Sequence, residues 1–244
     1  DSLYTDFSLL TSRPALTAEA ASLFNVLTGM SETAHFDELL VAPFNLAPRL
    51  LELINRERAN RRAGRPAGIF IKANGLVDQE IVDALYTASR EGVPIDLLVR
   101  GICCLQPGLP GVSETIRVRS IVDRFLEHSR IYLFTNGGEP LVFLGSADLM
   151  PRNLHRRVEV VFPVLDPELR RQFIEFIVPG YLADNVKTRL LQSDGLYTRR
   201  TRSEGETRHR VQAEFLLRYT PDSAEIPRIQ PPLRQDHPAI SAKA

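Results

Sequence analysis

The sequence predicts an α/β fold in which helices pack on both faces of one sheet. Short apolar runs alternate along the chain with longer segments whose apolar residues recur at helical spacing. The run 95–100 is apolar at most positions, which is typical of a strand buried on both faces. Hydrophobic residues make up 43% of the 244-residue chain, enough for a sizeable core. Strands that alternate with helices favour a sheet covered on both sides.

The first part of the chain is expected to form a helix, a strand and a second helix. Ala and Leu recur at helical spacing over 15–30, and the apolar run 39–44 predicts the first strand. Asn45 is positioned to cap the following helix, which ends in the basic stretch 56–65. A second strand is expected over 68–73.

The next helix and strand have clear boundaries. Asp78 is expected to cap a helix that Gly92 and Pro94 end. The strand over 95–100 follows, and then a loop rich in proline and glycine at 106–113.

Shorter elements are expected beyond this loop. They are a strand over 115–119, one or two helical turns over 121–127, a hairpin of strands 130–134 and 141–144, and a strand over 158–164. Asp166 and Pro167 have the residue types of a helix cap and a first helical position. We expect that helix to end at Pro179-Gly180.

The last part of the chain changes in composition. Residues 198–210 are basic and resemble a loop, and 211–219 are expected to add an edge strand to the sheet. From Pro221 onward the chain is polar and rich in proline, which predicts disorder.

Arginine dominates the positive charge of a chain whose formal net charge is zero. Three of the 30 basic residues are lysine, and the remaining 27 are arginine. A genomic preference for arginine codons explains such a bias most simply. Arginine also binds phosphate with two parallel hydrogen bonds, which lysine cannot do, so the two interpretations are compatible.

The cysteines and the ends of the chain indicate a piece of a cytosolic protein. Cys103 and Cys104 are adjacent and complete no zinc site, so they are expected to be reduced thiols. No apolar run approaches the roughly 20 residues that cross a bilayer. The chain begins at Asp1 without an initiator Met or a secretory leader, which predicts a fragment of a longer protein.

The segment 121–148 holds the strongest candidate for a functional site. His128 is followed two residues later by Arg130, and the predicted hairpin brings back Gly145-Ser146 and Asp148. A lone histidine is most often a satisfied core residue, but the charged residues around this one favour a polar site. An imidazole, a guanidinium and small hydrogen-bonding groups in one pocket suit a phosphoryl group.

Several ungapped segments of the chain resemble the long, ATP-dependent polyphosphate kinase family of bacteria. They are 4–11, 98–103, 121–128, 145–148 and 157–160. The segments occur in the order found in that family, and the similarity runs from Leu3 to about Leu191. The order and the extent make the resemblance specific.

The resemblance implies a phospholipase D-like mixed sheet flanked by helices on both faces. Members of the family carry two successive phospholipase D-like domains. Residues 1–35 would then be the tail of the first domain, 36–197 the second domain, and 198–244 a basic and proline-rich tail that is partly disordered.

The site motif departs from that of phospholipase D-like hydrolases. Those sites normally carry His-x-Lys-x4-Asp and then Gly-Ser-x-Asn. Here His128 is present, but Arg130 replaces the lysine, Thr135 replaces the aspartate and Asp148 replaces the asparagine. These replacements fit the kinase branch and argue against plain phosphodiester hydrolysis.

The resemblance also implies a reaction and roles for three residues. The family reversibly transfers the terminal phosphate of ATP to polyphosphate through a phosphohistidine, which would lie upstream of Asp1. His128 would contact phosphate and act as a catalytic acid or base, because imidazole exchanges protons near neutral pH. Arg100 ends a strand and would bind the phosphates of the nucleotide, and Tyr4 would lie near the nucleotide as well.

Cofactors and partners follow from the same resemblance. Mg²⁺ is expected, with its ligands upstream of this fragment, and the fragment alone is expected to be inactive. ATP, ADP and polyphosphate are the expected partners, with homo-oligomers and peripheral association with the membrane, and without nucleic acid. No metal site is expected in this chain, since the other histidines lack metal-ligand spacing. They are His35, His155, His209 and His237.

Eight arginines and no lysine occur between Arg100 and Arg157. They indicate either a solvated basic face or a tunnel for a polyanion, whose binding each neutralised phosphate strengthens. Arg117 and Arg119 alternate on a predicted strand and would share one face. With Arg130 they are the candidate polyphosphate contacts.

Two other functions remain open at this point. One is a phospholipase D-like hydrolase of phosphodiesters, and the other is a non-catalytic module that binds polyanions. The chain has no Gly-x4-Gly-Lys-Ser/Thr phosphate loop and no Gly-x-Ser-x-Gly elbow. ATP would therefore not be held by a phosphate loop.

Overall fold

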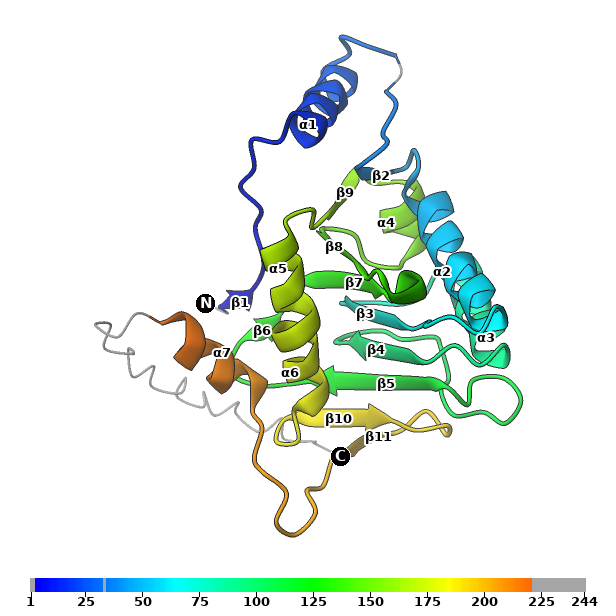
Figure 1. Ribbon diagram of the computed structural model, residues 1–244, viewed down its shortest axis with the longest axis vertical. Coiled ribbons are helices and arrows are strands. Elements are labelled where there is room, and N and C mark those ends of the chain that lie inside the picture. The colour runs from blue at the N-terminus through cyan, green and yellow to red at the C-terminus, as the bar shows by residue number, and fades with distance from the viewer. Residues whose placement is uncertain (1–2, 33, 221–244) are drawn as a thin grey trace, which may run out of the picture.

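A nine-stranded mixed sheet forms the centre of the protein in the computed structural model, which describes residues 3–32 and 34–220 (Figure 1). From one edge to the other the strands are β11 (Tyr197–Arg199), β10 (Thr188–Leu191), β5 (Ile116–Ile121), β4 (Ile95–Val99), β3 (Ile69–Ala73), β7 (Arg130–Phe134), β8 (Leu141–Gly145), β9 (Glu159–Pro163) and β2 (Leu40–Ala42). Strands β3, β4 and β5 are parallel, and the other neighbours pair antiparallel. The predicted α/β class with a mixed sheet is confirmed.

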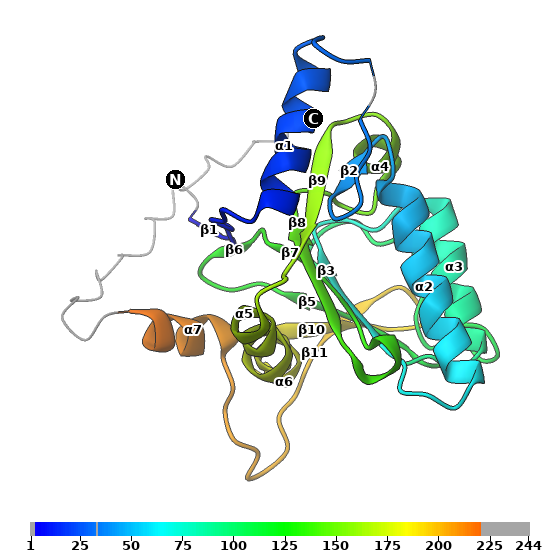
Figure 2. The same cartoon turned by 45° about the horizontal axis from the view of Figure 1, so that its top comes forward.

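Helices cover both faces of this sheet (Figure 2). The helices are α1 (Pro14–Leu27), α2 (Leu46–Arg62), α3 (Gln79–Arg90), α4 (Pro151–His155), α5 (Pro167–Gln172), α6 (Val178–Ala183) and α7 (Val211–Tyr219), with a 3-10 turn, η1, at Asn136–Gly138 and a π-helical turn, η2, at Phe173–Ile177. Helices α2 and α3 pack on one face, and α5, η2 and α6 pack on the other.

Each face of the central strands has its own apolar core. Alternate residues point to opposite faces, so Ile71 and Leu97 pack with the α2 and α3 side, whereas Phe70 and Leu98 pack with the α5 to α6 side. The core residues on both faces are buried, and each fully buried Leu, Ile or Phe contributes about 1.5–3 kcal/mol. The strand over 95–100 is therefore buried on both faces, as the sequence predicts.

The expected helical turns over 121–127 are wrong. Strand β5 continues to Ile121, and Leu126–Glu127 form a short strand, β6, parallel to β1 (Tyr4–Thr5). The pairing joins residues more than 120 positions apart, so a tertiary contact overrides the local helical signal. His128 consequently lies in the short link between β6 and β7.

Two further boundaries differ from the predictions. Residues 211–219 form α7 instead of an edge strand, with Val211 buried against the α5 to α6 core. The helix expected to end at Pro179-Gly180 continues to Ala183, because η2 places Pro179 in the first turn of α6, where its missing N–H is tolerated. Gly180 lets α7 approach closely, since a Cβ there would lie 3.2 Å from the Phe215 ring.

The two predicted aspartate caps are confirmed, but Asn45 acts differently. Asp78 accepts a hydrogen bond from the amide of Ile81, and Asp166 accepts from the amide of Leu169. The Asn45 side chain instead accepts from the Val41 amide and donates to carbonyls of the preceding loop. It therefore holds the turn that enters α2 rather than the first amides of the helix.

Three other expectations concern membrane-spanning helices, the C-terminal residues and the division into domains. None of the helices within 3–32 and 34–220 is long and apolar enough to cross a membrane. The disorder expected from Pro221 onward lies outside the described residues. The proposed division into 1–35, 36–197 and 198–244 stays a prediction.

Candidate functional site

An open cavity of about 490 Å³ lies at the carboxyl ends of β3 and β4. Asn74 follows β3, Arg100 follows β4 and His128 precedes β7, so the sheet order β4-β3-β7 brings these three residues together at one end of these strands. The loops after β3 and β4 approach closely, because a Cβ at Gly101 would lie 2.6 Å from the Asn74 carbonyl oxygen. Ligands of open α/β sheets gather at this end of the strands.

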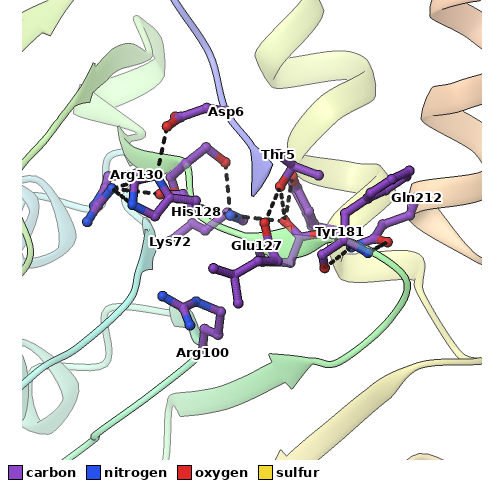
Figure 3. Close-up of polar contacts among 12 residues, drawn as sticks. Thr5, Asp6, Lys72, Arg100, Glu127, His128, Arg130, Tyr181 and Gln212 are labelled. Carbon is purple, nitrogen blue, oxygen red and sulfur yellow. Dashed lines mark hydrogen bonds and ion pairs between the residues drawn. The ribbon is translucent and has the colours of Figure 1, made fainter. Parts of the chain in front are cut away.

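His128 has an anchored side and an accessible side. Its Nδ1 lies 2.8 Å from a carboxylate oxygen of Asp6 (Figure 3). The Tyr4 ring meets the imidazole edge-on with centroids 5.1 Å apart. A carboxylate at Nδ1 favours the tautomer protonated there, in which Nε2 is an acceptor that Arg130 Nη1 approaches at 3.2 Å. The side chain is 34% exposed and lines the cavity.

Arg130 connects His128 to the end of β8. Its Nε and Nη2 each lie 3.2 Å from one of the two carboxylate oxygens of Asp148, and its Nη1 donates to the His128 carbonyl at 2.8 Å. Nη1 also lies 3.2 Å from both ring nitrogens of His128. Asp148 accepts the backbone amide of Asn74 at 2.7 Å as well. This guanidinium is therefore largely neutralised and helps to fix the geometry of the site.

Three other arginines give the cavity its positive charge. Arg100 donates to the Asn74 side chain at 3.0 Å, and Arg152 and Arg157 are exposed at the rim. Within the described residues no carboxylate pairs with any of these three guanidinium groups. Asp148 is paired with Arg130, and Glu159 accepts hydrogen bonds from Ser146 and Asn153. The cavity is thus suited to an anion with several charged oxygens.

A buried network supports the segment that carries His128. The Glu127 carboxylate accepts from Lys72 at 3.1 Å, and also from Thr5, Tyr181 and Gln212 (Figure 3). Together these donors come from β1, β3, α6 and α7. The backbone next to His128 is consequently tied to four separate elements.

Lys72 belongs to this network and is not a phosphate ligand. Lys72 lies near the end of β3, close to the cavity, but its side chain is 2% exposed and also donates to the carbonyl and hydroxyl of Ser129. Burial lowers the pKa of Lys72, and the charge of Glu127 opposes that shift. For Tyr181, by contrast, burial raises the pKa, and the charge of Glu127 adds to that shift.

The predicted site residues are not all at this cavity. Arg100, His128 and Arg130 line it together, whereas Tyr4 touches the His128 ring and lines an adjoining apolar cavity of about 340 Å³. Arg117 and Arg119 line a separate hollow between β5 and β10.

The geometry adds residues that the sequence did not single out. Asp6 is 122 positions from its partner His128, so local patterns could not reveal the pair. Arg152 and Arg157 were among the eight arginines, but an arginine-rich chain gives no reason to prefer one over another. Arg119 pairs with Asp96 in its separate hollow.

The cavity is not built for a cation. Within the described residues no group of three or more His, Cys, Asp or Glu side chains is arranged to hold a metal ion. The charges at the rim come from arginine, which repels Mg²⁺. The residues present therefore do not fit a magnesium site.

The chain matches a family model described as polyphosphate kinase C-terminal domain 2 over residues 39–212. It is 50% identical over 214 residues to a polyphosphate kinase of Pseudomonas aeruginosa, which covers 88% of this chain and 31% of that protein. It is 46% identical over 228 residues to a polyphosphate kinase of Synechocystis, which covers 93% of this chain and 31% of that protein. The chain thus spans about a third of the length of these relatives.

Two solved structures resemble the chain to different degrees. The crystal structure of polyphosphate kinase from Porphyromonas gingivalis superposes with a TM-score of 0.82 at 43% identity, over 85% of this chain and 32% of that chain. The phospholipase D family member Nuc from Salmonella typhimurium aligns with a TM-score of 0.46 at 16% identity, over 64% of this chain and 97% of that chain.

Proposed function

Because the chain belongs to the polyphosphate kinase family, we propose that it forms the C-terminal part of an enzyme that reversibly transfers the terminal phosphate of ATP to polyphosphate. The observation that carries this proposal is the cavity in which a carboxylate-anchored imidazole lies with three guanidinium groups that no carboxylate within residues 3–32 and 34–220 pairs. Guanidinium groups form strong hydrogen bonds with phosphate oxygens, so this combination suits a chain of phosphates better than most other ligands.

Each residue of the cavity then has a physical role. Transfer breaks the bond between the terminal phosphorus of ATP and its bridging oxygen, and negative charge develops on the departing ADP. Arg100, with Arg152 and Arg157 at the rim, would bind and neutralise phosphate oxygens. His128, held at Nδ1 by Asp6, would donate a hydrogen bond or a proton from Nε2 when protonated.

Other parts of the reaction would lie outside this chain. We assign the attacking histidine, which carries the phosphate as a covalent intermediate, to the part of the enzyme that precedes Asp1. The ligands of Mg²⁺ are assigned there as well. ATP, ADP and polyphosphate would be the partners, and assembly into homo-oligomers and peripheral association with the membrane of a cytoplasmic enzyme belong to the same proposal.

Substitution of His128 tests the proposal in the intact enzyme that contains this chain. His128→Ala is expected to lower incorporation of labelled phosphate from ATP into polymer by about 10²–10⁴-fold, the range for loss of a general acid or base. The far-ultraviolet circular dichroism should stay unchanged, because the side chain is half-exposed. Arg90→Gln, an exposed residue at the end of α3, is the control and should keep full activity.

Two results would contradict this assignment. Wild-type turnover in His128→Ala would remove His128 from the reaction. Polymer made from ATP by the 244-residue chain alone would show that no upstream histidine is required.

A further inference from the structure

A second cluster of arginines lies in the loop after β11. Arg199, Arg200, Arg202 and Arg208 line a cavity of about 430 Å³ with Asn185, Val186 and Thr201. No carboxylate and no aromatic side chain is among these lining residues. We call this cavity the arginine basin. The sequence marked residues 198–210 only as basic and loop-like.

Backbone carbonyls hold two of the four guanidinium groups in place. Arg199 donates to the Val186 carbonyl at 3.2 Å, and Arg200 donates to the Ala183 and Asp184 carbonyls at 3.2 and 3.1 Å. Ordered guanidinium groups lose less side-chain entropy when an anion binds. This part of the basin is therefore prepared for a ligand.

The loop that carries the other two arginines is also fastened. The Asn185 side chain donates to the Thr207 carbonyl at 2.8 Å and accepts the His209 amide at 2.9 Å. Arg202 and Arg208 are exposed on this loop. Within the described residues neither forms an ion pair with a carboxylate, whereas Arg200 pairs with Glu206 at 2.9 Å.

A charge arrangement beside the basin does not stabilise the fold. Arg189 of β10 lies directly opposite Arg199 of β11 in the antiparallel pair. Like charges at directly opposed positions destabilise a sheet, and Arg202 and Arg208 add to the local positive potential. Local violations of this kind are expected where a site binds a ligand of opposite charge.

The basin and the His128 cavity lie at the same end of the strands, the end at which β4 and β5 finish. Strand β10 begins at Thr188 beside Ile121, the last residue of β5, and β5 pairs with β4, after which Arg100 follows. The amide of Arg200 donates to the Thr188 carbonyl at this end. Three strand spacings, about 14 Å, separate β4 from β11, which carries Arg199, so an anion longer than tripolyphosphate is needed to span the distance.

We propose that the arginine basin is an accessory binding site for linear polyphosphate, which rests on the function proposed for the His128 cavity. Several guanidinium groups around one hollow suit a ligand with many adjacent charges. Single-stranded nucleic acid fits less well, because the basin offers its bases no aromatic partner. A polymer that occupies both places is retained more tightly, since the second contact forms at high effective concentration.

Binding measurements with two lengths of ligand test the proposal. The double variant Arg202→Gln/Arg208→Gln is compared with Arg65→Gln/Arg90→Gln, an exposed pair at the opposite end of the sheet with the same change in charge. Calorimetric titrations of the intact enzyme would use tripolyphosphate and long polyphosphate, at several salt concentrations. Tripolyphosphate is too short to occupy both places.

The expected result is a loss that depends on ligand length. The basin variant should bind long polyphosphate about tenfold more weakly. The slope of the logarithm of affinity against the logarithm of salt concentration should be shallower by about one to two units. Its affinity for tripolyphosphate and its KM for ATP should match those of the wild type. The control pair should leave both affinities unchanged.

Each other outcome has a distinct meaning. Equal binding of long polyphosphate by wild type and basin variant would overturn the accessory site and leave the proposed function intact. A wild-type enzyme that binds neither ligand would overturn the proposed function, and the basin proposal with it. Single-stranded DNA or anionic vesicles that depend on Arg202 and Arg208 more strongly than polyphosphate does would show that the basin serves another ligand.

Discussion

Glu127 and His128 are adjacent in the chain but lie in opposite environments. The Glu127 carboxylate is 3% exposed and accepts hydrogen bonds or an ion pair from four side chains. The His128 ring is 34% exposed and faces an open cavity. The difference indicates that the protein buries a charge network in order to hold a neighbouring ring accessible.

The network around Glu127 contributes more to geometry than to net stability. A buried ion pair loses so much hydration that replacing it with apolar residues is often neutral, whereas removing one partner leaves an uncompensated charge. Glu127 joins the N-terminal strand β1 to β3, α6 and α7. These ties define the position of the backbone from which His128 projects.

Removal of Lys72 should have the largest effect on stability. Lys72→Met leaves the Glu127 carboxylate buried without its cation, and the free energy of unfolding should fall by about 3–5 kcal/mol. Urea denaturation at neutral pH measures the change.

A second substitution separates the buried charge from lost packing. Lys72→Met/Glu127→Gln should recover part of the stability, because the neutral amide needs no cation, and a double-mutant cycle gives the coupling. A loss below about 1 kcal/mol in Lys72→Met would show that Lys72 and Glu127 are not coupled as a buried pair.

Loss of Asp6 should affect activity more than stability. Asp6→Asn removes the carboxylate that holds His128 at Nδ1, and turnover in the intact enzyme should fall by about 10–100-fold, the usual effect of losing such an orienting partner. The pair is partly exposed, so unfolding should change by less than about 1 kcal/mol. The KM for ATP should change little.

Nitrogen NMR distinguishes an orienting role from a structural one. In the wild type the His128 ring should favour the tautomer protonated at Nδ1, and Asp6→Asn should remove that preference. Asp6→Glu, which keeps the carboxylate, should restore part of the turnover. An unchanged tautomer together with unchanged turnover would show that Asp6 does not orient the ring.

The surroundings of Glu127 and His128 show which features local sequence could predict. The strands and most helices followed from apolar spacing and from caps such as Asp78 and Asp166. His128 and Arg130 could be placed in one pocket from the predicted hairpin, and Arg100 at the end of a predicted strand, but only the resemblance to the kinase family assigned Arg100 to phosphate binding. The rule that ligands gather at strand ends needs no long-range information.

Features created by distant contacts could not be predicted in this way. Residues 121–127 and 211–219 were given the wrong element type, and the structure joins the two segments. Gln212 of α7 hydrogen-bonds Phe125 and Glu127 through its side-chain amide. Contacts across 85 or more positions leave no periodic signal in either segment.

A second ion pair, between Asp123 and Arg210, also joins these two parts of the chain, and its arginine is more exposed than Lys72. Arg210 binds both oxygens of Asp123 at 2.6 and 2.8 Å, and Lys187 lies 3.6 Å away. Burial acts to raise the pKa of Asp123, but the hydrogen bonds and charge of Arg210 outweigh it, so the pKa lies below the ordinary 3.8.

Removal of the Asp123 carboxylate should destabilise the fold less than removal of Lys72, and its effect should depend on pH. Because the folded-state pKa is lowered, the pair stabilises the protein fully above the ordinary carboxyl value of 3.8, and this contribution is lost as the pH falls through the folded-state pKa. Asp123→Asn should lower the free energy of unfolding by about 1–3 kcal/mol at pH 7, and by less in acid. Urea denaturation of wild type and variant at pH 7 and pH 3 measures both values. A difference between them that stays constant with pH would mean that ionisation of Asp123 does not contribute to stability.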